Sequence, residues 1–113
     1  MPDSLRRLPD FEADLYLLTT DEGGRRSGIS AGYKPTFNFE RPDKMHNMGG
    51  FAEPDFDGLE LGTTVHTGFR LGAPEFNKGR LYVGQTFTIK EGGRIVGRGR
   101  ITAVIAPSLR LVT

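Results

Sequence analysis

The chain contains no cysteine and no tryptophan, and it has only two histidines in 113 residues. Without cysteine, disulfide bonds and thiolate chemistry are excluded. The histidines, His46 and His66, stand far apart in the sequence, so a zinc site is not expected. No apolar run approaches the roughly 18 residues of a membrane-spanning helix, and the first residues lack the apolar centre of a secretory signal. We therefore expect a soluble, cytoplasmic protein.

Motifs of common catalytic sites are absent as well. No serine lies in a nucleophile-elbow sequence, and no phosphate-binding Gly-x-x-x-x-Gly-Lys-Ser/Thr loop occurs. The carboxylate pair Glu12 and Asp14 falls on the solvent face of a predicted strand, where the burial that tunes a catalytic carboxylate is not expected. We expect neither enzymatic activity nor a cofactor.

An acidic segment from Glu53 to Glu60 contains part of a calcium-loop pattern, Asp55-x-Asp57-Gly58. The full pattern needs another oxygen ligand before the glycine and a glutamate six residues after it. This chain has Thr64 at that second position. A solvated acidic loop is therefore expected here, and no metal site.

Sixteen glycines, seven prolines and short apolar runs favour many short strands over long helices. At 113 residues the chain is long enough for one domain. Alternation of apolar and polar residues predicts strands from Phe11, over Tyr33–Glu40, over Thr63–Leu71 and in a final hairpin, with at most a short strand near Met45–Ala52. About six such strands predict a small antiparallel barrel or sandwich. We expect a lead-in over residues 1–10, the barrel over 11–106 and a tail over 107–113.

The final hairpin allows a prediction of its register. Its inward residues are expected to be Phe87 and Ile89 on the first arm, and Ile95, Ile101, Ala103 and Ile105 on the second. A two-residue turn at Gly92-Gly93 would set Ile89 opposite Val96, which mixes inward and outward positions, so we predict a three-residue turn. Gly97 and Gly99 then face inward. Lys90, Arg98 and Arg100 form a basic stripe on the outer face.

Charge is unevenly distributed along the chain although the net charge is only +1. Residues 1–75 hold 8 Lys and Arg against 13 Asp and Glu, whereas residues 76–113 hold 7 against 1. Two interpretations stay open. The basic part pairs with the acidic part inside the fold, or it binds phosphate groups of a nucleic acid.

The tetrapeptide Glu-Gly-Gly-Arg occurs twice, at residues 22–25 and 91–94, and each copy follows a strand-like run. The first copy lies between Phe-Glu-Ala-Asp-Leu-Tyr-Leu-Leu (11–18) and Gly-Tyr-Lys-Pro-Thr-Phe-Asn-Phe (32–39). The second lies within Phe-Thr-Ile-Lys-Glu-Gly-Gly-Arg-Ile-Val-Gly-Arg-Gly (87–99). Together these stretches, about half of the chain, resemble the third, C-terminal domain of elongation factor Tu.

The resemblance implies a six-stranded antiparallel β-barrel without catalytic activity. In that family the domain packs against the GTPase domain, contacts the nucleotide-exchange factor and holds the T stem of aminoacyl-tRNA. Carried over by residue, Glu91 and Gly92 fall at the turn that contacts tRNA, and Arg25 falls in the loop that faces the GTPase domain.

This chain also departs from the family pattern. The T-stem glutamine of the family falls on Thr36, and the arginine that ends the same strand falls on Glu40, which reverses the charge. No GTPase domain is present in these 113 residues. We therefore expect this chain to share the fold of the family more than its tRNA role. We do not expect it to hydrolyse GTP.

Three functional hypotheses follow. The first is a module that docks on a translation GTPase or another protein partner through Arg25, Arg26, Ser27, Asp55 and Asp57. The second is a binder of a tRNA stem or other RNA through Lys90, Glu91, Gly92, Arg94, Arg98 and Arg100. The third, an enzyme, would have to use His46 or His66 and is the least favoured.

Overall fold

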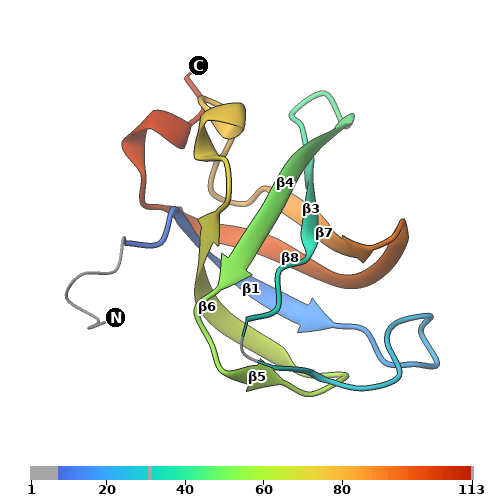
Figure 1. Cartoon of the computed structure of the whole chain (residues 1–113). Coiled ribbons are helices and arrows are strands. Elements are labelled where there is room, and N and C mark those ends of the chain that lie inside the picture. The colour runs from blue at the N-terminus through green and yellow to red at the C-terminus, as the bar shows by residue number, and fades with distance from the viewer. Residues whose placement is uncertain (1–7, 31, 113) are drawn as a thin grey trace.

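Six strands close into an antiparallel barrel in the order β1-β6-β4-β3-β7-β8, which confirms the predicted all-β fold (Figure 1). The computed structural model describes residues 8–30 and 32–112. The barrel strands are β1 (Phe11–Leu17), β3 (Thr36–Glu40), β4 (His46–Pro54), β6 (Thr64–Leu71), β7 (Thr86–Glu91) and β8 (Arg94–Val104). Two short 3₁₀ helices, η2 (Pro74–Asn77) and η3 (Pro107–Leu109), follow β6 and β8. Among the described residues, no helix is long and apolar enough to cross a membrane.

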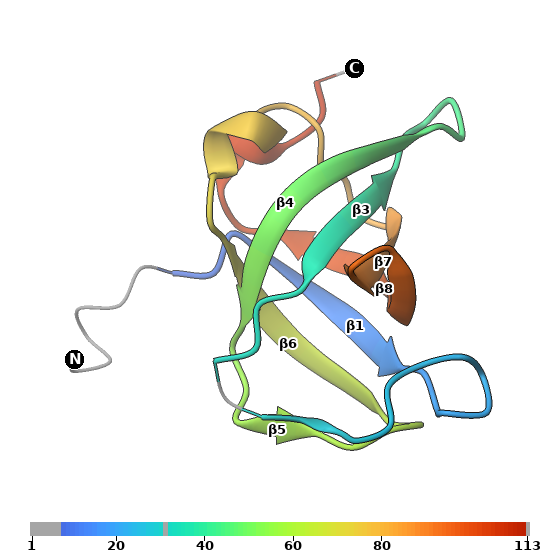
Figure 2. The ribbon, with the colours of Figure 1, turned by 45° about the vertical axis from the view of Figure 1, so that its right-hand side comes forward.

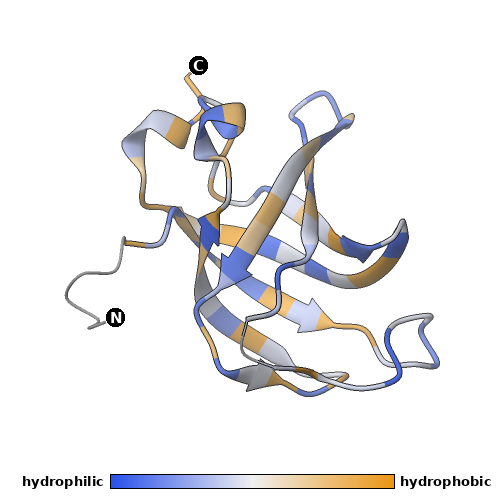
Figure 3. Cartoon of the chain, viewed as in Figure 1, coloured by the Kyte–Doolittle hydropathy of each residue, from blue (hydrophilic) through white to orange (hydrophobic). Residues whose placement is uncertain are grey.

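Phenylalanine rings fill the centre of the barrel. Phe11, Phe37, Phe39, Phe69 and Phe87 are at most 3% exposed, and neighbouring ring centroids lie 5.0 to 6.2 Å apart. The period-two pattern of the sequence places them there, because successive side chains of a strand point to opposite faces. Figure 3 shows the resulting alternation of hydrophobic and hydrophilic bands along the strands. Each buried ring contributes about 1.5–3 kcal/mol of transfer free energy to folding.

The turn of the β7–β8 hairpin differs from the prediction. Glu91 pairs with Arg94, so the turn has only the two residues Gly92 and Gly93, whose φ angles are 57° and 94°. Positive φ at both positions is the geometry of the tight two-residue turn that glycine favours. The predicted three-residue turn is therefore wrong. The mixing of inward and outward residues that a two-residue turn would cause is avoided within the paired strands, because a β-bulge leaves one residue of β8 unpaired.

This bulge, together with a second one, changes which β8 residues face the core. Lys90 pairs with Ile95 but Ile89 pairs with Gly97, so Val96 is the extra residue and is fully buried. A second shift at Thr102, opposite Glu12 and Ala13 of β1, buries Val104. The predicted inward positions Ile95, Ala103 and Ile105 are wrong, and Ile101, between the two bulges, is correct. Each bulge inserts one residue and so reverses the alternation.

Gly97 and Gly99 face inward as predicted, and both lie where the barrel wall is tightly packed. A Cβ atom on Gly97 would lie 2.8 Å from Cγ1 of Ile89. A Cβ atom on Gly99 would lie 2.2 Å from Cζ of Phe87. These glycines therefore make room for the large side chains of β7.

Strand β4 is longer than predicted and runs through a glycine pair. Gly49 forms a bulge, because Phe37 pairs with Gly50 and Asn38 pairs with Met48. Gly50 has a φ of 80°, and a Cβ on Gly49 would lie 2.2 Å from the Phe39 ring. Gly49 and Gly50 thus allow the strand to pass the Phe39 ring.

A small second sheet lies beside the barrel and joins two segments that are far apart in sequence. It consists of β2 (Ile29–Ser30) and β5 (Gly58–Leu59), with Ile29 paired to Leu59 and Ser30 to Gly58 (Figure 2). Ile29 is buried against the core. The loop that follows the first Glu-Gly-Gly-Arg is thereby fastened to the acidic segment.

Candidate functional site

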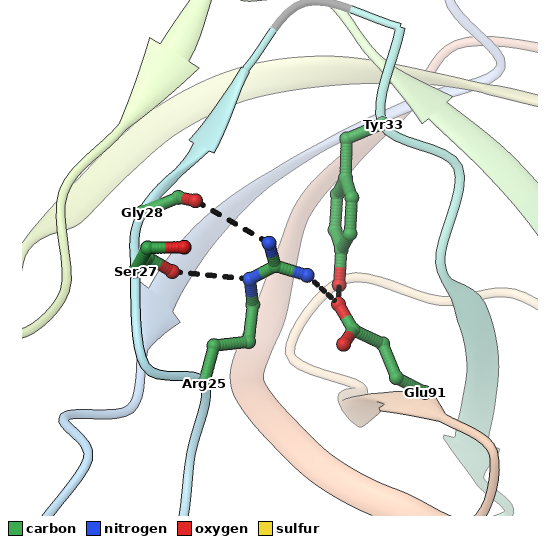
Figure 4. A network of polar contacts seen from close by, with 5 residues as sticks. All are labelled: Arg25, Ser27, Gly28, Tyr33 and Glu91. Carbon is green, nitrogen blue, oxygen red and sulfur yellow. Dashed lines mark hydrogen bonds and ion pairs between the residues drawn. The ribbon is translucent and has the colours of Figure 1, made fainter.

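The two Glu-Gly-Gly-Arg copies meet in space through one ion pair. A guanidinium N–H of Arg25, from the first copy, donates to Oε2 of Glu91, from the second copy (Figure 4). The Tyr33 hydroxyl donates to the same carboxylate oxygen. The side chains of Arg25 and Glu91 are 26% and 36% exposed, so the contact is partly shielded from water. The repeated tetrapeptide therefore forms a bridge between two turns of the barrel.

Further contacts hold the Arg25 side chain in place. Nε donates to the Ser27 carbonyl at 3.1 Å and Nη2 to the Gly28 carbonyl at 3.4 Å (Figure 4). The guanidinium carbon lies 5.2 Å from the centre of the Tyr33 ring, within cation–π range. Burial, followed by the bond to Glu91, raises the pKa of Tyr33, so its hydroxyl remains a donor. The Arg25 side chain thus holds Ser27 and Gly28 of the loop after Gly24.

The glutamate of the first copy has a different role from that of the second. Glu22 Oε1 accepts the Thr19 backbone N–H at 2.8 Å and the Tyr16 hydroxyl at 2.6 Å. The bond from the Thr19 backbone, followed by that from Tyr16, holds the pKa of Glu22 below its ordinary value. This carboxylate stabilises its own turn, whereas Glu91 bonds to a distant loop.

The residues proposed for protein docking lie in the two segments that the β2–β5 sheet joins. Arg26, Ser27 and Asp57 are exposed, while Arg25 is held in the bridge. Asp55 is fixed more firmly, because Oδ1 lies 3.3 Å from Nη1 of Arg70 and its backbone carbonyl accepts the Thr67 hydroxyl. The structure thus brings the Arg25–Ser27 and Asp55–Asp57 groups to one side of the barrel.

The residues proposed for RNA binding lie on the outer face and turn of the β7–β8 hairpin. Arg98 is set between Thr88 and Tyr16, and Arg100 between Thr86 and Asp14 of the neighbouring strands. Arg94, Arg98 and Arg100 are exposed, and they make no ion pair with the described part of the chain. Lys90 is half-buried and Gly92 is exposed at the turn.

Glu91, which the resemblance places at the tRNA-contacting turn, is bonded within the protein. Its carboxylate is engaged by Arg25 and Tyr33. The contact between Arg25 and Glu91 therefore links the residues proposed for protein docking to those proposed for RNA binding. Tyr33 was missed as a site residue, because no local pattern relates it to Glu91 across 58 residues.

Both histidines lie at the surface. His66 Nδ1 is 2.8 Å from Oδ1 of Asp14 on the adjacent strand, and both side chains are more than half exposed. His46 is exposed at the start of β4. Residues 8–30 and 32–112 contain no group of three or more Asp, Glu or His side chains arranged to hold a metal ion.

A scan against models of known protein families finds no match to this chain.

Proposed function

We propose that this protein is a binding module similar to the third domain of elongation factor Tu. It docks on a translation GTPase or another protein partner through the surface formed by residues 25–30 and 53–60, here called the docking surface. The observation that supports this proposal is the β2–β5 pairing, which joins the two segments at Ile29–Leu59 and Ser30–Gly58.

The composition of the docking surface suits protein recognition. Phe56 and Leu59 are half-buried and pack against the core, while Arg26, Ser27 and Asp57 of the same two segments are exposed. An apolar centre with a polar rim is the usual anatomy of a protein interface. The Arg25 bridge fixes one side of this surface before any partner arrives, which lowers the entropic cost of binding.

A charge-reversal experiment tests the proposal. Arg26→Glu and Asp57→Arg proteins are compared with wild type for binding to purified translation GTPases by calorimetry. Lys78→Glu is the matched control, because Lys78 is exposed and follows η2 at the far end of the molecule from β5 (Figure 1). We expect about tenfold weaker binding for the first two variants. The control variant is expected to bind as tightly as wild type. Binding that all three variants leave unchanged would contradict the docking surface.

One observation favours a second candidate function, binding of a tRNA stem or other RNA. Arg98 and Arg100 are exposed side by side on β8 without an ion pair to any residue within 8–30 or 32–112. Such cations release counterions when they neutralise phosphates, so affinity falls steeply with salt. Fluorescence anisotropy with labelled tRNA at several salt concentrations tests this. Arg98→Glu is expected to abolish RNA binding, whereas Arg26→Glu, at an exposed position of the docking surface, is expected to leave it unchanged. Binding that does not depend on salt would exclude this function.

A further inference from the structure

A groove opens beside the C-terminal half of β8, where β7 no longer accompanies it. Just before β7 begins, the Gly84 N–H donates to the Ile101 carbonyl and the Ile101 N–H donates to the Gln85 carbonyl, both at 2.8 Å. Leu81 pairs instead with the segment 109–111, since its N–H donates to the Leu109 carbonyl and the Leu111 N–H donates to the Leu81 carbonyl, both at 2.8 Å. Residues 81–83, 102–104 and 110–111 line a groove of about 450 Å³ at this place, here called the β8 groove.

The walls of the β8 groove are mostly apolar. They include Leu81, Val83, Ala103, Val104 and Leu111, and Tyr82 and Thr102 line the groove as well. Val83 is 66% exposed at the rim. A volume of this size, with apolar walls and few polar groups, is typical of sites for small ligands.

One charged side chain, Arg110, is among the described residues that line this groove. Its Nε and Nη2 donate to the Val104 carbonyl at 3.2 and 3.1 Å. These two bonds fix the guanidinium at the groove and leave its remaining N–H groups for another acceptor. Arg110 is exposed, and no described carboxylate pairs with it. A carboxylate is the acceptor that matches a planar guanidinium.

The wall that carries Tyr82 and Val83 is held by a buried glutamine. Gln85 is 2% exposed, and its Nε2 donates to the Glu40 carbonyl at 2.8 Å and to the Arg80 carbonyl at 3.2 Å. Its Oε1 lies 3.4 Å from the Tyr82 backbone nitrogen, which donates to it. The groove is therefore formed in advance, and a ligand would not have to order it.

From these features we propose that the β8 groove binds an apolar carboxylate. The apolar part lies against Val83, Ala103 and Leu111, and the carboxylate bonds to the guanidinium of Arg110. This site is separate from the docking surface and does not depend on the function proposed above. The ligand chemistry has two sources, a free apolar acid or the carboxyl terminus of a peptide that ends in an apolar residue.

Nuclear magnetic resonance titration of the whole protein with octanoate, and with octan-1-ol as the uncharged control, tests the proposal. Octanoate is expected to give saturable shifts at the amides of Val83, Ala103 and Leu111. Octan-1-ol is expected to bind about tenfold more weakly, since it lacks the charge-assisted bonds. An acetylated tripeptide ending in valine, as acid and as amide, distinguishes the two sources: stronger binding of the acid tripeptide than of octanoate assigns the ligand to a peptide terminus.

Two sets of variants test the roles of charge and position. Arg110→Met is expected to weaken octanoate binding about tenfold. Because this change also removes the bonds to Val104, the pair Val83→Glu and Val83→Gln gives an independent test at an exposed position. The glutamate is expected to weaken octanoate binding, while the glutamine of the same size has little effect. Equal binding of octanoate and octan-1-ol, equal effects of the two Val83 variants, or no saturation up to about 10 mM would overturn the proposal.

Discussion

Arg25 and Glu91 lie 66 residues apart, and each belongs to one copy of the same tetrapeptide. Their ion pair connects the loop before β2 to the turn between β7 and β8, with Tyr33 bonded to the same carboxylate. The contact joins a residue of the docking surface to one that the resemblance assigns to tRNA contact. A ligand that engages Glu91 would therefore have to compete with Arg25.

Removing the negative charge of this bridge is expected to destabilise the protein. Glu91→Gln should lower the free energy of unfolding by about 1 kcal/mol, because the contact is only partly shielded from water. Urea denaturation measures the change. In a double-mutant cycle with Arg25→Met, the two losses should be less than additive. Arg94→Met, at the exposed arginine of the same tetrapeptide, should stay within about 0.5 kcal/mol of wild type. Additive losses in the cycle would show that the pair does not interact.

Stability should decline in acid through Glu22 and Glu40. The Thr19 N–H holds the pKa of Glu22 below the ordinary value, and the Thr86 hydroxyl does the same for Glu40. A lowered folded pKa gives stability that is present above the unfolded pKa, about 4.3, and is lost as pH falls through the folded value. Thermal unfolding measured from about pH 6 to pH 2.5 should show this decline.

The matched variant for this test is Glu22→Gln, which should make the acid decline shallower. Asp21→Asn is the control, because Asp21 is exposed and makes no side-chain hydrogen bond to the described residues. A pH profile that Glu22→Gln and Asp21→Asn change equally would contradict the assignment.

Adding one methyl group at Gly99 should be costly. The new Cβ would lie 2.2 Å from Cζ of Phe87 and 2.7 Å from the Asp14 carbonyl, and a fully buried ring has no room to move away. Gly99→Ala should lower the free energy of unfolding by about 2 kcal/mol or more. Gly72→Ala, whose nearest contact would be 3.5 Å from the Phe51 carbonyl, should change it by less than about 0.5 kcal/mol. Chemical denaturation of both variants checks the difference.

Thr102 offers a stabilising substitution. Its Oγ1 is buried and has no hydrogen-bond partner among the residues that the structure describes. Valine has nearly the same shape without the unsatisfied hydroxyl, so Thr102→Val should raise the free energy of unfolding by about 1 kcal/mol. Thr88→Val, on the outer face of β7, should have an effect within about 0.5 kcal/mol. A loss of stability in Thr102→Val would show that the hydroxyl is satisfied in solution.

The alternation of apolar residues was readable from the sequence wherever the ladder is regular. Phe87 and Ile89 were expected inward and are buried. Side-chain direction in a strand depends only on neighbouring residues, so a local pattern is enough to predict it. The short strand β2 was not predicted, because two residues are too few to show the alternation of a strand.

The errors on β8 have a different origin. Val96 and Val104 are buried in place of Ile95 and Ile105, because bulges at two points shift the register by one residue. Where a bulge forms depends on the strand opposite and on the turn that closes the hairpin. The β8 sequence alone therefore does not show where its bulges form.

By itself, the sequence determined that this protein is built of short strands around phenylalanine rings, because both the alternation and the glycine turns are local. Only the tertiary structure decided that Arg25 meets Glu91, that residues 25–30 lie against residues 53–60, and that Arg110 stands at an apolar groove. The physical reason is that closing the barrel brings distant turns together. These contacts depend on strand order and register, which are set by the packing of the whole core.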